Sequence, residues 1–240
     1  AEGIIYKSDI AKSIITKSRS SNKWTEIYNT RSYPFMDQRK RYDLDTVAKP
    51  SGEYKVAVMA NKEETVYTKL CNFKNIDEVA QCKVVCGVII NEASKENPGK
   101  VLTNIKAIGP YVVSSESWSL IAAFNTEEET VNCKSYIKTK FVRFLANQTV
   151  NGRSNVTDNT FEFVPLQNFT ATSDIDWSQP ISNIDQQLYK KYNLSEEEVA
   201  YIESTIKSLD TTVEASPTMK FTLQEAEANL LNRRIQNEEF

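Results

Sequence analysis

The hydrophobic positions in the first two thirds of the chain come in short runs that are rich in β-branched and aromatic residues. Such runs favour β-strands, and turn-forming sequences such as Pro50-Ser51-Gly52 and Asn97-Pro98-Gly99 separate them. We expect strands at residues 24–28, 54–59, 83–90, 101–108 and 118–124, and a further buried strand at residues 161–164. Together these strands predict a strongly twisted mixed β-sheet.

The period of the hydrophobic pattern changes near residue 127. Ile137, Phe141, Phe144 and Leu145 recur at the spacing of one helical stripe, so we expect a helix that begins near Glu127 and buries this stripe. Basic residues occupy its flanks and outer face, namely Lys134, Lys138, Lys140 and Arg143. The following segment, residues 147–160, is rich in Asn, Thr and Ser and predicts an exposed loop.

The pattern beyond Trp177 predicts a helical hairpin. Apolar residues from Ile181 to Tyr192 follow the spacing of one helix, and Asn193 suits the left-handed conformation that often ends a helix. Ser195 and Glu198 have the spacing of a capping box at the start of a second helix.

These patterns predict the α+β class and two parts. Residues 1–177 would form the twisted mixed sheet with its basic helix and loop, and residues 178–240 a helical subdomain and tail. A chain of 240 residues is long enough for one large core with such an appendage. Because it opens with Ala and then directly with the strand-like sequence GIIYK, we expect it to be part of a longer polypeptide.

Charge is distributed unevenly along the chain. The formal net charge is −3, yet residues 134–153 hold five Lys or Arg and no acid, and residues 1–55 hold eleven against seven acids. Residues 174–210 reverse this balance, with three bases and eight acids. A concentrated positive segment in an acidic chain indicates a polyanionic partner.

Several kinds of chemistry are excluded by what the sequence lacks. There is no histidine, which removes Ser/His/Asp and Cys/His nucleophiles and most catalytic zinc sites. The six glycines are not spaced as in the common phosphate-binding loops, so we expect no nucleotide site. No apolar run approaches the roughly 20 residues that a membrane span needs, so we expect no membrane contact.

Cysteines and paired carboxylates leave minor alternatives open. The four cysteines are too sparse for a disulfide framework, which indicates reduced thiols and a cytoplasmic protein. Cys82 and Cys86 could bind zinc, but their apolar surroundings favour buried thiols, and we expect no metal site. Asp174 and Asp176 could hold Mg²⁺ in a divergent nuclease, which is an alternative hypothesis to a binding function.

Three segments resemble a known family. SYIKTKFVRFL, FEFVPLQNFT and SDIDWSQPISNIDQQLYKKYNLSEEEVAYIE are similar to the C-terminal target-recognition part of restriction-modification adenine-N6 DNA methyltransferases, including their fusions with type II endonucleases. GKVLTNIKAIGP and SESWSLIAAF extend the resemblance, which covers most of residues 99–207. The segment ANQTVNGRSNVTDNT departs from the family pattern, which has Arg and Thr-Gln there.

The resemblance implies a domain that reads a short asymmetric sequence in double-stranded DNA. It also implies a parent enzyme that uses S-adenosylmethionine to methylate adenine, with Mg²⁺ if it cleaves as well. The family's (N/D)PP(Y/F) motif is missing here, since the chain has no Pro-Pro pair. We therefore expect a non-catalytic DNA-binding module without a cofactor of its own, which partners the methyltransferase catalytic domain of the same parent chain.

Candidate DNA contacts follow from the chemistry of the two partners. Ammonium and guanidinium groups neutralise phosphates, and amide or guanidinium groups pair with base edges. We expect phosphate contacts from Lys134, Lys138, Lys140 and Arg143 and from a second cluster, Arg39, Lys40 and Arg41. We expect base contacts from Gln148, Asn151, Arg153 and Asn155.

Two further expectations concern partners. A protein-interaction module, in which the basic helix contacts an acidic protein, remains an alternative to DNA binding. The acidic C-terminal hairpin should face away from DNA and brace the recognition sheet or dock on the absent catalytic domain.

Overall fold

Two strands that are buried on both faces lie at the centre of the molecule. β5 (Cys82–Gly87) pairs antiparallel with β9 (Trp118–Phe124), and β7 (Lys106–Ile108) and β1 (Arg31–Ser32) complete a sheet of order β1-β9-β5-β7. Successive residues of β5 point to opposite faces, so that Val84 enters one hydrophobic cluster and Val85 another. Strands covered on both faces have uninterrupted apolar sequences for this reason.

This computed structural model describes residues 6–19, 22–32, 46–59, 66–70, 73 and 76–209.

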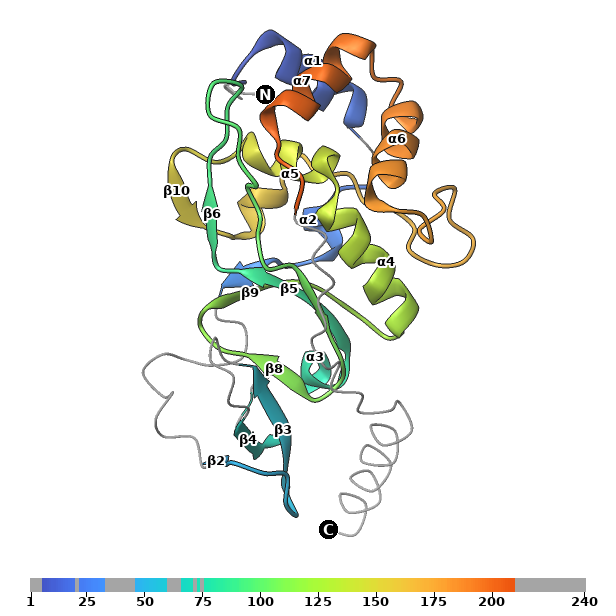
Figure 1. Ribbon diagram of the computed structural model, residues 1–240. Helices are drawn as coiled ribbons and strands as arrows, with labels where there is room; N and C mark the ends of the chain where they lie inside the picture. Colours follow the sequence, from blue (N-terminus) through green and yellow to red (C-terminus); the bar gives the residue numbers. More distant parts are fainter. Residues whose placement is uncertain are drawn as a thin grey trace.

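A second sheet lies on one side of the central sheet. It has the order β2-β4-β3-β8, formed by β2 (Thr46–Val47), β4 (Val66–Lys69), β3 (Tyr54–Met59) and β8 (Val112–Ser114). β3 pairs antiparallel with β4 and parallel with β8, which makes this sheet mixed. The smaller hydrophobic cluster joins it to the central sheet and to α3 (Ile76–Ala80) (Figure 1).

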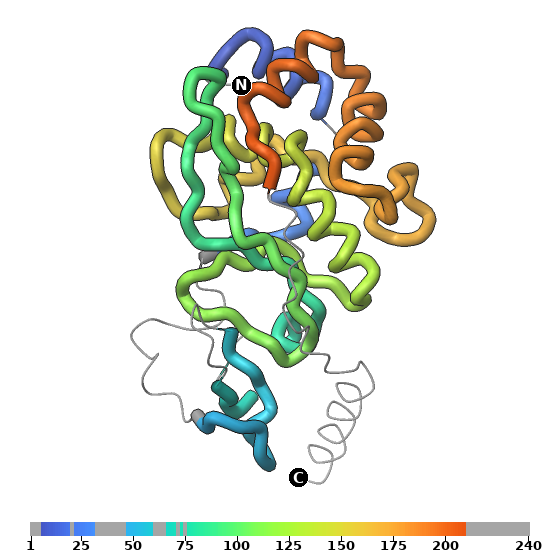
Figure 2. The backbone as a smooth tube through the Cα atoms, in the orientation of Figure 1, coloured from blue at the N-terminus to red at the C-terminus, as the bar shows by residue number. Residues whose placement is uncertain are grey.

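Helices cover the other side of the central sheet. α4 (Glu127–Lys138) packs on β5, β7 and β9, and α6 (Ile181–Lys191) packs on α4. α5 (Lys140–Asn147) contacts α4, α6, α7 (Glu196–Thr205) and the 3-10 helix η3 (Asp158–Phe161). α1 (Asp9–Ser18) lies beside α7 at the end of the molecule farthest from the second sheet (Figure 2), and α2 (Trp24–Ile27) packs on η3.

The predicted α+β class is confirmed. The strands predicted at residues 54–59 and 118–124 have the bounds of β3 and β9, and the run at 83–90 is divided between β5 and β6 (Ile89–Asn91). In place of the predicted single sheet, the described residues form three small sheets, the third being the pair of β6 and β10 (Arg153–Asn155).

Three predicted strands are wrong in whole or in part. Residues 24–28 include the helix α2, because Trp24 is fully buried against Phe161 and this packing overrides β propensity. Of residues 101–108 only β7 is a strand, since Val101 and Asn104 have φ angles of 61° and 54°, which no strand accommodates. Residues 161–164 form the end of η3 and a turn.

The predicted basic helix is broken in two at Thr139. Thr139 has an extended backbone, with φ −60° and ψ 151°, and its hydroxyl accepts a hydrogen bond from Val142 N as the N-cap of α5. The predicted apolar stripe is confirmed in both helices, since Ile137, Phe141, Phe144 and Leu145 are all fully buried. α5 is buried on every side, however, and so has no outer face.

The C-terminal helical hairpin is confirmed. Ser195 and Glu198 make both hydrogen bonds of the capping box at the start of α7, and Asn193 takes the left-handed conformation with φ 49°. Ile184 on α6 and Ile202 on α7 belong to the same hydrophobic cluster as α1 and α5. The predicted domain boundary at residue 177 therefore does not coincide with a division of the core.

Candidate nucleic-acid interface

A two-stranded antiparallel ribbon carries the exposed polar groups that were predicted to read DNA bases. β10 pairs with β6 in the register Arg153 to Asn91, Ser154 to Ile90 and Asn155 to Ile89. Because Arg153 and Asn155 are two residues apart, they lie on one face of the ribbon together with Asn91. Arg153, Asn155 and Asn91 are all exposed.

The turn before β10 is held by charged groups on neighbouring segments. The Glu92 carboxylate accepts a hydrogen bond from Gly152 N at 2.7 Å, and Gly152 O accepts one from Glu92 N at 2.7 Å. Lys7 Nζ lies 2.5 Å from the same carboxylate and also contacts the Val150 carbonyl. The hydrogen bond from Lys7 lowers the pKa of Glu92, so this anchor is ionised at neutral pH. The turn requires the φ of 69° that Gly152 adopts.

A shallow hollow of about 450 Å³ adjoins the ribbon. Hydroxyl and amide side chains dominate its lining, which includes Asn151, Ser154, Asn155, Thr157 and Asn159. The predicted base-reading residue Asn151 is exposed here. Neutral donors and acceptors of this kind can form hydrogen bonds with base edges without a strong charge preference.

Gln148 does not belong to this exposed group. It is 9% exposed, and its Nε2 donates to the Phe144 carbonyl at 3.0 Å. The expectation that Gln148 lies in an exposed loop is wrong, because α5 continues to Asn147 and Gln148 is its C-cap. Gln148 is therefore not placed to contact bases.

Lys134 and Lys138 are one helical turn apart on α4 and are half-buried. Their role as phosphate contacts stays a prediction.

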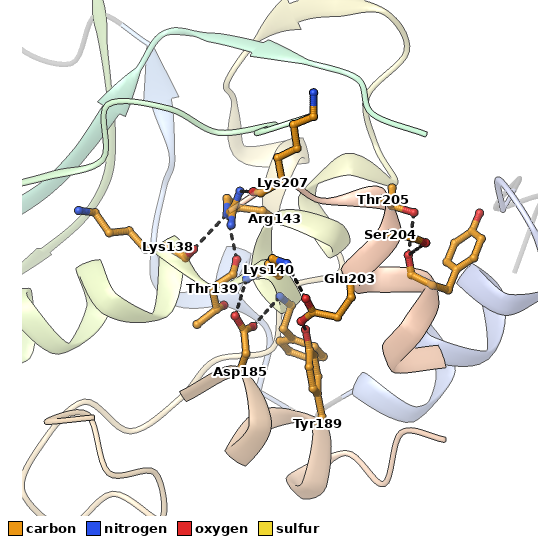
Figure 3. Close-up of polar contacts among 12 residues, drawn as sticks. Lys138, Thr139, Lys140, Arg143, Asp185, Tyr189, Glu203, Ser204, Thr205 and Lys207 are labelled. Atoms are coloured by element: carbon orange, nitrogen blue, oxygen red, sulfur yellow. Dashed lines mark hydrogen bonds and ion pairs between the residues drawn. The ribbon is translucent and has the colours of Figure 1, made fainter. Parts of the chain in front are cut away.

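Arg143 is buried, which corrects its predicted place on the outer face of the helix. The residue is 1% exposed, and its Nε donates to the carbonyls of Lys138 and Thr139 at 3.0 and 3.2 Å. Its Nη1 donates to the carbonyl of Lys207 at 2.7 Å (Figure 3) and to that of Lys100 at 3.0 Å. Its donors therefore bind backbone, and Arg143 cannot be a phosphate contact in this structure.

Burial shifts the pKa of Arg143 and of its neighbour Asp185 in opposite senses. Loss of hydration lowers the pKa of Arg143 to about 10, partly offset by the nearby carboxylate of Asp185. Burial raises the pKa of Asp185 to about 6, although its carboxylate accepts hydrogen bonds from Lys140 N and Phe141 N, both at 3.0 Å. Both groups are charged at neutral pH, and Asp185 caps the start of α5.

Lys140 is engaged within the protein as well. Its Nζ forms an ion pair with Glu203 on α7, and its side chain is only 17% exposed. Glu203 also accepts a hydrogen bond from Tyr189 Oη at 3.0 Å, which joins α5 to both helices of the hairpin (Figure 3). The Lys140 charge is thus largely neutralised by an internal carboxylate.

The second predicted basic cluster, Arg39, Lys40 and Arg41, lies outside the residues that the structure describes.

The carboxylates considered for a nuclease are used by the fold. Asp174 is paired with Lys191 at 2.8 Å, and Asp176 accepts hydrogen bonds from Ser178 N and Oγ and from Gln179 Nε2. The bonds from Ser178, followed by that from Gln179, lower the pKa of Asp176. Over the described ranges no group of three or more His, Cys, Asp or Glu is placed to hold a metal ion.

Three described cysteines, Cys82, Cys86 and Cys133, are buried free thiols. Burial raises the pKa of Cys86 to about 12, so this thiol stays protonated and packs as a small apolar group.

The structure separates the predicted contacts into two groups. Figure 1 shows β6 and β10 at one side of the helical end of the molecule and α4 at the other, with the segment that follows α7 between them. Arg153, Asn155 and Asn151 belong to the first group, and Lys134 and Lys138 to the second. A single continuous cationic ridge, as the sequence predicted, is not present among the described residues, because Arg143 is buried and Lys140 is paired.

Sequence reasoning missed two residues that the structure places among these groups. Asn91 shares a ribbon face with Arg153, and only the strand register reveals this. Lys207 follows α7 in a segment where acids outnumber bases. Counting charges by segment therefore did not identify it as a candidate.

Comparison with known proteins adds no family to this description. No protein-family model matches the chain, and no curated protein matches it. In the described part of the chain no helix has the length and apolar character needed to cross a membrane.

Proposed function

We propose that this chain is a sequence-specific DNA-binding module, the target-recognition part of a restriction-modification adenine-N6 DNA methyltransferase. The observation that carries the proposal is the exposed face of the β6–β10 ribbon. A two-stranded ribbon fits the major groove, where Arg pairs with guanine and Asn with adenine. Arg153, Asn155 and Asn91 supply these groups from one face.

The availability of these side chains supports the same function. Neither Arg153 nor Asn155 uses its side chain in a hydrogen bond within the described ranges, in contrast to Arg143. Internal contacts hold the ribbon itself, since Val156 N donates to Val88 O at 2.8 Å and Glu92 anchors the turn. A rigid backbone with uncommitted donors is what direct readout of base edges requires.

Phosphate contacts in this proposal come from Lys134 and Lys138. Each phosphate that a lysine neutralises releases counterions, so binding should weaken steeply as salt rises. Arg143 and Lys140 have internal structural roles in this revised interface.

The chain itself would bind DNA without a cofactor, and catalysis would belong to the parent enzyme. S-adenosylmethionine, and Mg²⁺ if the parent cleaves, would be held by the methyltransferase catalytic domain of that longer chain. We place the protein in the cytoplasm, where free thiols such as Cys82, Cys86 and Cys133 persist.

Selection from a pool of randomised DNA duplexes tests the proposal. The 240-residue chain should enrich a short asymmetric sequence, and its affinity for that sequence should exceed its affinity for a scrambled duplex. A chain that retards no duplex at low salt would contradict DNA binding and favour the protein-interaction alternative. Cleavage of the duplex on addition of Mg²⁺ would instead favour the nuclease alternative.

A further inference from the structure

Three segments that are far apart in the sequence meet at the guanidinium of Arg143. They are the end of α4 at Lys138, the segment before β7 at Lys100, and the segment after α7 at Lys207, and each gives its backbone carbonyl to this side chain. All three residues are lysines. The buried Arg143 guanidinium therefore fixes the backbone positions of three lysines.

Backbone hydrogen bonds fix Lys207 further. Gly99 N donates to Thr205 O at 3.2 Å, and Lys207 N donates to Gly99 O at 2.8 Å, which together make a short parallel bridge. Lys207 thus has a defined position although it follows the last described helix.

The side chains of Lys138 and Lys207 extend away from Arg143. Figure 3 shows that they point in different directions, Lys138 to the left and Lys207 to the top of the view, whereas Asp185 and Glu203 lie below the guanidinium. Lys207 is exposed and Lys138 half-buried, and neither ammonium group is paired with a carboxylate within the described ranges. The nearby acids are already engaged, Asp185 with the start of α5 and Glu203 with Lys140.

The end of a helix ordinarily repels anions, because its last carbonyls carry partial negative charge. Here Arg143 donates to the carbonyls of Lys138 and Thr139 and so offsets that charge. The guanidinium also adds a buried positive charge near the backbones of both lysines, partly offset by the Asp185 carboxylate. An anion can therefore approach the end of α4 at this place.

We propose that Lys138 and Lys207 contact separate phosphates of one DNA duplex, so that the two lysines around Arg143 make one phosphate-binding surface. This inference rests on the proposed DNA-binding function and deepens it, since it adds Lys207 from an acidic segment to the interface. Lys138 ends α4, and Lys207 lies in the segment after α7, which Figure 1 shows between α4 and the β6–β10 ribbon. A duplex that is read by the ribbon would thus have its backbone held beside it.

The salt dependence of DNA binding tests this site. The affinity of the full chain for a labelled duplex is measured over a series of NaCl concentrations, for wild type and for Lys138→Ala, Lys207→Ala and the double variant. Each lost phosphate contact should lower the magnitude of the slope of log K against log salt by about 0.9, and the double variant by about twice that. Lys138→Arg and Lys207→Arg, which keep the charge, should retain the wild-type slope.

Lys190→Ala is the matched control, because Lys190 is exposed on α6 and has no part in the convergence at Arg143. It should leave the slope unchanged. An unchanged slope in Lys207→Ala, or an equal fall in Lys190→Ala, would overturn the site.

The outcomes separate this inference from the function on which it rests. If the salt slope of DNA binding depends on Lys138 and Lys207 but no DNA sequence is enriched, the phosphate contacts are supported and target recognition is contradicted. If a DNA sequence is enriched but the salt slope is the same with and without Lys138 and Lys207, target recognition is supported and the phosphate contacts are contradicted. Failure to bind any duplex at low salt would contradict both.

Discussion

At the scale of single residues, Arg143 shows how a basic side chain can serve the fold instead of a ligand. Its guanidinium donates to the carbonyls of four residues, namely Lys100, Lys138, Thr139 and Lys207. Planar geometry with several donors suits arginine to this task, and lysine could not reproduce it. The same cationic residue that the sequence indicated as a DNA contact thereby joins the segments that carry Lys100, Lys138 and Lys207.

Replacing Arg143 should therefore damage the fold. Arg143→Met removes the donor of four carbonyls and a positive charge near the buried Asp185 carboxylate, and should lower the free energy of unfolding by about 3–5 kcal/mol. Urea denaturation of both proteins measures this loss. The matched variant Lys190→Met alters an exposed basic residue and should change stability by less than about 0.5 kcal/mol. A similarly small change in Arg143→Met would contradict the structural role.

Asp185 should give the protein a specific pH dependence. Its pKa of about 6 in the folded state lies above the value of about 4 of an unfolded aspartate, so the folded state binds more protons between these values. Stability contributed by this group is thus greatest at low pH and falls as pH rises through this window. Relative to Asp185→Asn, the wild type should lose about 2–3 kcal/mol over that range. Stability curves of the two proteins that run parallel from pH 4 to 6 would contradict this prediction.

At the scale of elements, the helix and strand predictions that were confirmed depended only on residues close together in the sequence. The capping box of α7 needs only Ser195 and Glu198, and strands β3 and β9 needed only their own apolar residues. The break at Thr139 was not predicted, because the Asp185 side chain that caps α5 comes from α6. The pairing of α5 with that distant carboxylate is a tertiary contact that periodicity cannot reveal.

In the candidate site, too, some residues could be predicted from the neighbouring sequence and others could not. Exposure of Arg153 and Asn155 follows from the polarity of their own segment, which the sequence shows directly. Burial of Arg143 depends on Lys100 and Lys207, which precede and follow it by 43 and 64 residues. Charge counts cannot distinguish an arginine that contacts a ligand from one that binds carbonyls of remote segments.

The junction of α1 and α7 yields a prediction at the same scale. Glu198 accepts hydrogen bonds from Ser195 N, from Ser13 Oγ at 2.6 Å and from Lys17 Nζ at 2.7 Å, so it caps α7 and also binds α1. Ser195→Ala should cost about 1 kcal/mol as the loss of a cap. Glu198→Ala should cost more, and amide exchange should accelerate in α1.

Glu197→Ala is the control for this pair, since Glu197 is an exposed acid in the same first turn. Its effect on stability should stay within about 0.5 kcal/mol. If Glu198→Ala left exchange in α1 unchanged, the ion pair with Lys17 would have no role in holding that helix.

At the scale of the whole molecule, the larger hydrophobic cluster runs without interruption from α1 to the end of α7. Ile14, Ile121, Phe141, Ile184 and Ile206 all belong to it, although they span nearly the whole described chain. The helical hairpin therefore packs against α4 and α5, and α4 in turn covers the central sheet. This packing supports the segments that carry Lys138 and Lys207.

Deleting residues 178–240 should consequently unfold the protein. The truncation removes Ile184, Leu188 and Ile202 from the core and takes away the Asp185 cap of α5 and the Lys207 carbonyl. Thermal unfolding followed by circular dichroism should lose its cooperative transition. A truncated chain that keeps both this transition and its affinity for DNA would show that residues 1–177 fold independently.

Base preference of the Arg153→Ala chain tests recognition by the β6–β10 ribbon most directly. Wild type, Arg153→Ala and Lys138→Ala are compared on one pool of randomised duplexes at fixed salt. Ribbon recognition predicts that Arg153→Ala loses about 1–3 kcal/mol of discrimination at one base pair, while Lys138→Ala weakens binding to all sequences alike. An unaltered preference profile in Arg153→Ala would contradict it.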